Sequence, residues 1–413
     1  MQRIFTLTLF IVFSISVFSQ TRYKDELFSV FKHDDIQYGS NYDSKNQLTN
    51  LLMDIYEPQG DSAKKRPVIF FIHGGSFVGG DREDQSIDKT AEFFAKKGYV
   101  TVNIEYRLEQ TTFIDPIVNF ADTYNWHRAI VRATQDLKAA IRFLKKDVAT
   151  NNNSYAVDTT SIFIYGSSAG AITALHTVYL DDTLEMNSIF KIAYRELGGL
   201  DGNSGNAGYS STSGIKAVVS CSGAVFDLNC MNNNKNIEFL GFHNNPDFTV
   251  PYDVGCFVTV ACWLGNYYGG NKVFPKAKSL GSYAEFYPIN QAGHPSDQVS
   301  DTASHRMILQ KTTDFLYRIV NTSITTSVKN NIAKNADIFP NPSSGDITIN
   351  IPVSMQQKVF QLQIFNVEGT EVYSAQFKNK DNVQLQLTLP NGIYVLSMNN
   401  AEENYLSKIT IVK

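Results

Sequence analysis

Short apolar runs alternate with amphipathic stretches from about residue 20 to residue 320. The runs that we predict to be strands are Pro67–Ile72, Val100–Tyr106, Ser161–Tyr165, Ile215–Ser220, Glu238–Phe242 and Ala284–Pro288. Between them, Ala133–Lys146 repeats apolar residues at helical spacing, which gives a helix with one buried face. Segments near Gln37–Tyr38 and at Leu51–Tyr56 are typical of antiparallel edge strands. This order predicts an α/β fold with a mostly parallel sheet flanked by helices.

The pattern changes after Val320. Residues 321–337 are rich in Asn, Thr, Ser and Lys and predict a linker. Beyond it, apolar and polar residues alternate in runs at Asp346–Val353, Val359–Asn366, Glu371–Phe377, Val383–Leu389, Ile393–Met398 and Leu406–Val412. A period of two is typical of half-buried strands. Residues 338–413 therefore predict a small antiparallel β-sandwich, separate from an α/β domain over residues 20–320.

The first nineteen residues have the features of a secretion signal. Arg3 supplies a positive charge, Ile4–Phe18 is apolar, and small residues precede Gln20, where cleavage would expose a new N-terminus. The apolar stretch is short for a membrane anchor, so we expect residues 1–19 to be removed. No later segment has enough consecutive apolar residues to span a bilayer. We therefore expect an exported protein with no integral membrane segment in its mature form.

The net charge and the cysteines indicate whether the chain is suited to bind nucleic acid or metal and whether it forms disulfides. The formal net charge is -4, which offers no basic surface for nucleic acid. The four cysteines, Cys221, Cys230, Cys256 and Cys262, lack the C-x-x-C spacing of a zinc site, so no metal is expected. Export favours disulfides, and three full pairings are open. We favour Cys256 with Cys262; buried thiols are the alternative.

Gly166-Ser167-Ser168-Ala169-Gly170 fits the pattern G-x-S-x-G. It follows the predicted strand Ser161–Tyr165 and precedes a stretch of small residues with helical character. This context of strand, sharp turn and helix is that of a nucleophile elbow, which exposes the central serine above the sheet. Ser168 is therefore the candidate nucleophile.

A second glycine motif, His73-Gly74-Gly75-Ser76, ends the predicted strand Pro67–Ile72. Backbone N–H groups of glycine can closely approach a developing negative charge. The N–H groups of Gly74, Gly75 and Ala169 are the candidate oxyanion hole. Phe77, beside this loop, is the candidate substrate-binding residue. A long Gly-, Ser- and Asn-rich loop at Gly198–Ser213, or Leu180–Leu197 before it, is expected to cover the site.

A serine nucleophile needs a histidine base and an acid that orients it, here in the chain order serine, acid, histidine. His294 lies in a turn after the strand Ala284–Pro288 and is the candidate base. Asp247, after the strand that ends at Phe242, is the candidate acid. Asp227 and Asp253 are its rivals. No cofactor is required by this chemistry.

These motifs resemble the α/β-hydrolase superfamily, within it the carboxylesterase and lipase groups that carry an HGG oxyanion motif. The resemblance covers roughly residues 50–320. His243-x-x-x-Asp247-x-x-Val250-Pro251 resembles the acid loop of the family, and Gly293-His294 resembles its base. The resemblance to this superfamily implies a serine esterase. For an exported esterase we expect short-acyl or carbohydrate-linked (acetyl or feruloyl) esters as substrates. A lipase, a serine peptidase of the same fold and a catalytically silent binding protein are the alternatives.

The tail resembles the type A C-terminal sorting domain of type IX secretion substrates. The resemblance rests on Phe339-Pro340-Asn341-Pro342-Ser343, on Asn391-Gly392-Ile393-Tyr394-Val395 and on the final Lys408–Lys413. It implies the type IX secretion machinery as a partner and a secreted or cell-surface location. A carbohydrate-binding sandwich is the alternative.

Overall fold

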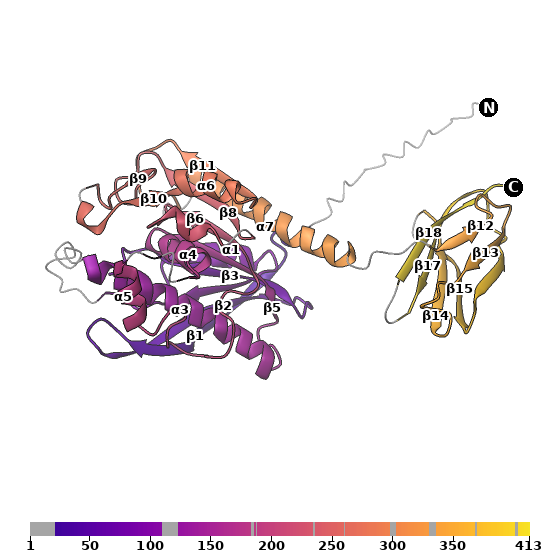
Figure 1. The fold of residues 1–413 in the computed structure, drawn as a ribbon, viewed down its shortest axis with the longest axis horizontal. Helices are drawn as coiled ribbons and strands as arrows, with labels where there is room; N and C mark the ends of the chain where they lie inside the picture. The colour runs from indigo at the N-terminus through magenta and orange to yellow at the C-terminus, as the bar shows by residue number, and fades with distance from the viewer. Residues whose placement is uncertain are drawn as a thin grey trace, which may run out of the picture. The chain divides into compact units, whose positions relative to one another are not determined.

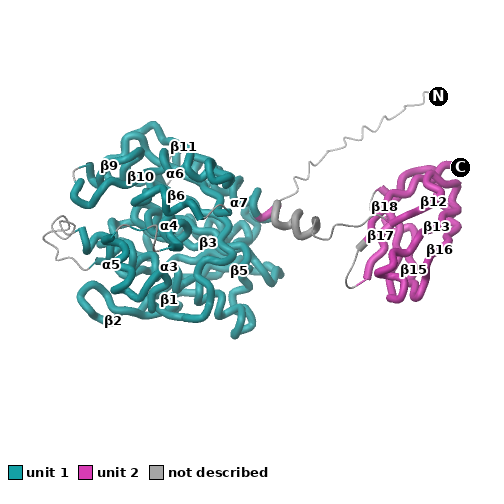
Figure 2. The backbone as a smooth tube through the Cα atoms, viewed as in Figure 1, with its two compact units in different colours: residues 1–319 teal, residues 320–413 magenta. Residues whose placement is uncertain are grey.

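The computed structural model describes residues 21–109, 123–182, 186, 188–233, 236–259, 261–297, 303–329, 336–367, 370–400 and 404–413. The chain divides into two compact units, Met1–Ile319 and Val320–Lys413 (Figure 2). The predicted signal peptide, residues 1–19, lies outside the described residues.

A large, mostly parallel sheet forms the centre of the first unit (Figure 1). Its strands, in spatial order, are β1 (Ser29–Tyr42), β2 (Leu48–Gln59), β4 (Val100–Ile104), β3 (Arg66–Ile72), β5 (Val157–Ser167), β6 (Ile215–Cys221), β8 (Glu238–Asn244) and β11 (Ala284–Ile289). From β4 to β11 neighbouring strands are parallel, whereas β1 and β2 are antiparallel edge strands. The predicted α/β fold with a mostly parallel sheet is confirmed.

Helices cover both sides of this sheet (Figure 1). They are α1 (Gln85–Ala95), α3 (Thr123–Thr150), α4 (Ala169–Tyr179), α5 (Ser188–Glu196), α6 (Gly270–Ser279) and α7 (Ala303–Lys329), with short 3₁₀ turns η2 (Leu228–Met231) and η3 (Cys262–Leu264). Because helices lie on both faces, the central strands read as continuous apolar runs, and every residue of β3 is buried. Every residue of α4 is buried as well, so the helix beneath the glycine motif is fixed inside the core.

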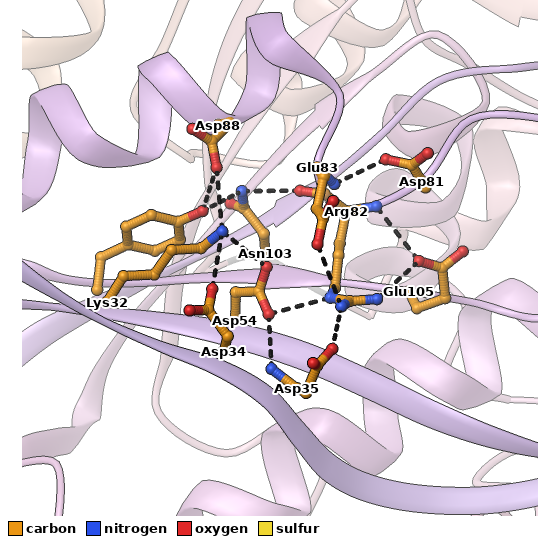
Figure 3. A network of polar contacts seen from close by, with 11 residues as sticks. Lys32, Asp34, Asp35, Asp54, Asp81, Arg82, Glu83, Asp88, Asn103 and Glu105 are labelled. Atoms are coloured by element: carbon orange, nitrogen blue, oxygen red, sulfur yellow. Dashed lines mark hydrogen bonds and ion pairs between the residues drawn. The ribbon is translucent and has the colours of Figure 1, made fainter.

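An ion-pair network ties the edge strands to the loop that follows β3 (Figure 3). Asp54, on β2, is fully buried and accepts from Arg82 Nε at 3.0 Å and pairs with Lys32 Nζ at 3.2 Å. The backbone N–H of Arg82 donates to Glu105 at 3.3 Å, and the Arg82 carbonyl accepts from Asn103 Nδ2 at 3.1 Å. Arg82 therefore fixes the far end of the loop that begins at His73.

A second, small sheet lies at the carboxyl end of the large one. It contains β7 (Ala224–Val225), β10 (Tyr267–Gly269) and β9 (Val254–Gly255). These strands are two or three residues long, and the sequence pattern did not predict them. Next to β9, Cys256 and Cys262 form a disulfide, while Cys221 and Cys230 remain buried thiols. The favoured pairing is therefore the one that forms.

Helix α7 runs to Lys329, so residues 321–329 of the predicted linker are helical, and residues 330–335 lie outside the described part. Extending a helix already anchored by packing costs far less than starting one, so a polar sequence can continue it. In α7, Ile308, Phe315 and Leu316 are the buried anchors.

The second unit is a sandwich of two antiparallel sheets. One contains β12 (Asp337–Phe339), β13 (Asp346–Asn350) and β16 (Asn382–Gln386); the other contains β15 (Glu371–Lys378), β14 (Val359–Phe365), β17 (Gly392–Asn399) and β18 (Asn404–Ile411). Alternate residues of facing strands, such as Ile349 and Leu362, are fully buried in one core. The period of two in the sequence predicted this sandwich, apart from the three-residue strand β12.

Candidate active site

The chain turns sharply between β5 and α4, at Ser168. The backbone of Ser168 has φ 53° and ψ -118°, a conformation that costs energy for a residue with a side chain. A Cβ on Gly166 would lie 2.3 Å from the carbonyl oxygen of Gly170, so this position requires glycine. The Ser168 N–H donates to the carbonyl of Cys221 at 2.8 Å, and this hydrogen bond ties the turn to the end of β6. The strand, turn and helix thus hold the Ser168 hydroxyl above the sheet.

The three side chains predicted as nucleophile, base and acid form one hydrogen-bonded chain. Ser168 Oγ lies 2.6 Å from His294 Nε2, and His294 Nδ1 lies 2.7 Å from Asp247 Oδ2. They come from the segments after β5, β11 and β8. Because the carboxyl ends of parallel strands meet at one edge of a sheet, residues this far apart in the chain come together. Nδ1–H donates to the carboxylate, which leaves Nε2 to accept the Ser168 proton.

Asp247 is buried and receives four donors. Its Oδ1 accepts from the backbone N–H groups of Thr249 at 2.8 Å and Val250 at 3.0 Å, and its Oδ2 lies 3.3 Å from His243 Nε2 as well as facing His294. Burial alone would raise the pKa of Asp247, but the hydrogen bonds from His243 and His294 hold it well below its usual range. The carboxyl group is therefore ionised and rigidly oriented toward His294.

His243 was not predicted to take part. Its Nδ1 accepts from the Gly270 N–H at 3.3 Å, so its proton is on Nε2, which lies 3.2 Å from the Val250 carbonyl and 3.3 Å from Asp247 Oδ2. The signal was present in the spacing His243-x-x-x-Asp247, but spacing alone does not show which ring atom faces the carboxylate. The rival acids lie elsewhere: Asp227 accepts from the Asn229 N–H, and Asp253 pairs with Lys272.

The loop after β3 brings Gly74 against the nucleophile. A Cβ on Gly74 would lie 3.2 Å from the Ser168 Cβ, so a side chain at position 74 would crowd the nucleophile, and glycine lets the loop backbone come close to it. His73 Nδ1 donates to the Gly74 carbonyl at 2.7 Å, and its ring stacks on Tyr106 with centroids 4.3 Å apart. Burial lowers the pKa of His73 to about 4, so the ring is neutral and serves the loop's shape.

Ala169 is the first residue of α4, and its N–H belongs to the N-terminal turn of that helix. The positive end of a helix dipole favours negative charge at this place. Gly74 therefore lies close to Ser168, Ala169 follows Ser168 in the chain, and Gly75, with φ 107°, follows Gly74 in the same turn. This arrangement suits an oxyanion hole.

An apolar pocket of about 130 Å³ opens beside Ser168. Phe77, predicted to bind substrate, lies in its wall and contacts Trp126 edge to face at a centroid distance of 5.4 Å. The complete lining is Ser76, Phe77, Trp126, Ser168, Ala169, Ile172, Thr249, Val250, Phe257, Val258, Ala261, Trp263 and Leu264. In the wall at 249–264, the sequence singles out Trp263, which, like Trp126, suits either an acyl pocket or ordinary packing. The other wall residues look like ordinary core positions and lie outside long strands and helices.

Among the described residues of Gly198–Ser213 and Leu180–Leu197, the two segments expected to cover the site, none lines the pocket. The long loop lies on α3 instead. Gln135 Nε2 donates to the Gly199 carbonyl at 2.7 Å, and Arg142 Nε donates to the Gly205 carbonyl at 3.0 Å. The Gly- and Asn-rich composition predicted a loop but not its location.

A buried carboxyl group behind the elbow was also missed. Asp297 accepts from Ser167 Oγ at 2.6 Å and from Tyr165 Oη at 3.0 Å. It follows His294 by three residues, so it ties the segment carrying His294 to the strand carrying Ser168. Burial raises the pKa of Asp297. These contacts span about a third of the chain, and no local sequence pattern marks them.

Metal and membrane sites can be considered only within the described parts of the chain. There, no group of three or more His, Cys, Asp and Glu side chains is arranged to hold a metal ion. The helices of the same parts include none with the length and apolarity that a bilayer span requires.

Comparison with known families gives two matches. Residues 53–250 match the BD-FAE family, and residues 337–413 match the secretion system C-terminal sorting domain. The first match includes the segments that carry Gly74, Ser168 and Asp247. The second spans the whole β-sandwich.

Several relatives and solved structures that are similar to this chain are esterases. Gut esterase 1 of Caenorhabditis elegans is 29% identical over 132 residues, 32% of this chain and 21% of the relative; carboxylesterase 3B of Mus musculus is 31% identical over 123 residues, 30% of this chain and 19% of the relative. The chain thus spans about a fifth of the length of these curated relatives. Esterase 2 of Thermogutta terrifontis phosphoramylated by tabun has 19% identity and a TM-score of 0.48, covering 72% of this chain and 98% of that one. The topology and the two family matches identify a chain in which an α/β-hydrolase domain of the esterase type is followed by a type IX C-terminal sorting domain.

Proposed function

We propose that this chain is an exported serine esterase that hydrolyses carboxylic esters through an acyl-enzyme. The observation that carries the proposal is the hydrogen-bonded chain from Ser168 through His294 to the ionised Asp247. The similarity to esterases supports the reaction class.

In the first half-reaction, His294 Nε2 removes the proton from Ser168 Oγ as the oxygen attacks the ester carbonyl carbon. The carbonyl π electrons move to the oxygen, and the N–H groups of Gly74, Gly75 and Ala169 donate to that oxyanion. Asp247 stabilises the positive charge on the His294 ring. The tetrahedral intermediate then collapses, the C–O bond to the alcohol breaks, and the alcohol leaves with the proton from His294.

In the second half-reaction, water replaces the alcohol. His294 takes a proton from the water as the water oxygen attacks the acyl carbon. The same N–H groups stabilise the second oxyanion. When this intermediate collapses, Ser168 leaves and regains its proton from His294, and the carboxylic acid is released. No step requires a metal or an organic cofactor.

We assign short-acyl or carbohydrate-linked (acetyl or feruloyl) esters as the substrates. The pocket beside Ser168 has about 130 Å³, and a cavity of roughly 150 Å³ in another protein holds benzene. A short acyl chain or a single aromatic ring is therefore the size that the apolar lining can enclose, with Phe77 as one wall. A long fatty acyl chain exceeds this volume.

We further propose that the mature protein is exported and then released or held at the cell surface. The support is the sorting domain over residues 337–413, together with the signal peptide expected at residues 1–19.

The test is hydrolysis of p-nitrophenyl esters from acetate to palmitate, with methyl ferulate and acetylated xylan, by the full chain and its Ser168→Ala variant. Turnover of short-acyl or feruloyl esters that is lost in the variant supports the proposal. Preference for palmitate indicates a lipase. Hydrolysis of peptide p-nitroanilides alone indicates a peptidase, and no turnover of any substrate indicates a silent binding protein.

A further inference from the structure

One wall of the apolar pocket is a short segment closed by a disulfide. Seven of the lining residues come from this stretch: Thr249, Val250, Phe257, Val258, Ala261, Trp263 and Leu264. Cys256 and Cys262 are bonded, with their Cα atoms 4.8 Å apart. Phe257, Val258 and Ala261 lie inside the ring that this bond closes, and Trp263 and Leu264 follow it directly. The cross-link therefore encloses or adjoins most of the wall.

The wall has little regular structure of its own. The strand before it, β9, has two residues, and the turn after it, η3, has three. Within the ring, the Ala261 N–H donates to the Phe257 carbonyl at 3.0 Å, and Val258 donates to the Thr249 carbonyl at 2.8 Å. After the ring, the Leu264 N–H donates to the Ala261 carbonyl and the Gly265 N–H donates to the Cys262 carbonyl, both at 3.1 Å. Local hydrogen bonds of this kind define its conformation.

The wall contains both buried and exposed side chains. Phe257 is buried between Trp126, at a centroid distance of 4.7 Å, and Tyr267, at 4.4 Å. In contrast, Val258 is 56% exposed and Trp263 is 49% exposed. Val258 and Trp263 also line the pocket, so the exposed part of the wall is next to the space that an acyl group would enter.

The backbone of the ring is also strained. Val258 has φ 52° and Thr259 has φ 56°, and a left-handed conformation is a true outlier for β-branched residues. Such a conformation persists only when the surrounding structure imposes it. The Cys256–Cys262 disulfide, which closes the ring at both ends, is a covalent constraint on this strained backbone.

We propose that the Cys256–Cys262 disulfide determines the acyl selectivity of this enzyme by holding the pocket wall closed. The inference rests on the proposed esterase function and adds a specificity-determining element to it. With the bond intact, the pocket favours short or single-ring acyl groups, butyryl among them, over longer chains such as octanoyl. When the bond is broken, Val258 and Ala261 move away from the pocket, so longer chains enter and butyryl loses contacts. An acetyl methyl group, close to Ser168, does not reach this wall.

The experiment compares kcat/KM for p-nitrophenyl acetate, butyrate and octanoate in the full chain, before and after dithiothreitol. The dithiol gives two electrons and two protons to the bond, producing two thiols and its own cyclic disulfide. The other two cysteines are already thiols, so one bond changes. We expect the ratio of butyrate to octanoate to fall about tenfold, since a methylene's fit in an apolar pocket is worth about 10-fold or more. The acetate value stays within about twofold.

The matched variant is Cys256→Ser with Cys262→Ser. It should show the altered ratio without dithiothreitol and no response to it, which excludes an effect of the reductant elsewhere. If the variant does not fold, reduction of the folded wild type still decides. An unchanged ratio in reduced wild type, with mass spectrometry showing the two free thiols, overturns the proposal. If the wild type shows no Ser168-dependent turnover before dithiothreitol is added, the esterase function itself is refuted.

Discussion

Replacing Asp247 by Asn tests how the acid acts on the base. The two oxygens of Asp247 have different partners: Oδ1 accepts from two backbone N–H groups, those of Thr249 and Val250, and Oδ2 accepts from His294 and His243. An asparagine has one oxygen and one NH₂ group. Its oxygen must occupy the Oδ1 place, because two fixed N–H groups point there. The NH₂ group therefore faces His294 Nδ1.

An NH₂ group cannot accept a hydrogen bond, so His294 must move its proton from Nδ1 to Nε2. Nε2–H then points at Ser168 Oγ and cannot take its proton. His243 cannot accept from the new NH₂ group either, because its Nδ1 accepts from the Gly270 N–H and its Nε2 carries a proton that faces the Val250 carbonyl at 3.2 Å. In serine proteases the same substitution lowers kcat about 10⁴-fold through the wrong tautomer. That factor corresponds to about 5 kcal/mol of activation free energy.

The assay is steady-state hydrolysis of p-nitrophenyl butyrate by the wild type, Asp247→Asn and Asp253→Asn. We expect kcat to fall about 10⁴-fold in Asp247→Asn with little change in KM, since Asp247 does not line the apolar pocket. Asp253, half exposed and paired with Lys272, is the matched control and should keep its activity. A folded Asp247→Asn variant that retains more than about a tenth of kcat refutes the tautomer argument.

Three further substitutions test the surroundings of the site. Gly166→Ala puts a Cβ 2.3 Å from the Gly170 carbonyl oxygen, so we expect kcat to fall at least about 10²-fold as the elbow shifts; wild-type kinetics in this variant would contradict the geometry. Burial raises the pKa of Asp297, so the folded chain keeps that proton to a higher pH than the unfolded chain. The free energy of unfolding should therefore decrease as pH rises above about 3.9, and urea titrations of Asp297→Asn should lack this component. Arg82→Ala removes the Nε donor 3.0 Å from buried Asp54, and we expect a loss of about 1–3 kcal/mol in urea unfolding. A loss below about 0.5 kcal/mol would show that Lys32 and the Asp35 N–H satisfy Asp54 without Arg82.

Local sequence patterns predicted those strands and turns whose conformation is determined by residues that are neighbours in the sequence. The strand Pro67–Ile72 is an unbroken apolar run because both faces of that strand are covered, and β3 spans Arg66–Ile72. The elbow was recognisable because a sharp turn requires glycine at Gly166 and Gly170. In the second unit, the period of two marks strands with one buried face. In each case neighbouring residues carry the whole signal.

The remainder depends on contacts between distant segments. Asp297 meets Ser167 across 130 residues, and no pattern near either residue indicates the partner. The strands β7, β9 and β10 are too short to show periodicity, yet they support the pocket wall. The Gly198–Ser213 loop shows the same limit, since composition predicts irregular backbone but not that the loop packs on α3.

The most direct test of the account is covalent labelling of the full chain with a fluorophosphonate, followed by peptide mass spectrometry. The account predicts one equivalent of label on the Ser168 peptide, blocked in Ser168→Ala and strongly slowed in His294→Ala, because attack on phosphorus needs the same activated oxygen. Absence of label on folded wild-type protein, or label on another serine with Ser168 untouched, would contradict the assignment of Ser168 as the nucleophile.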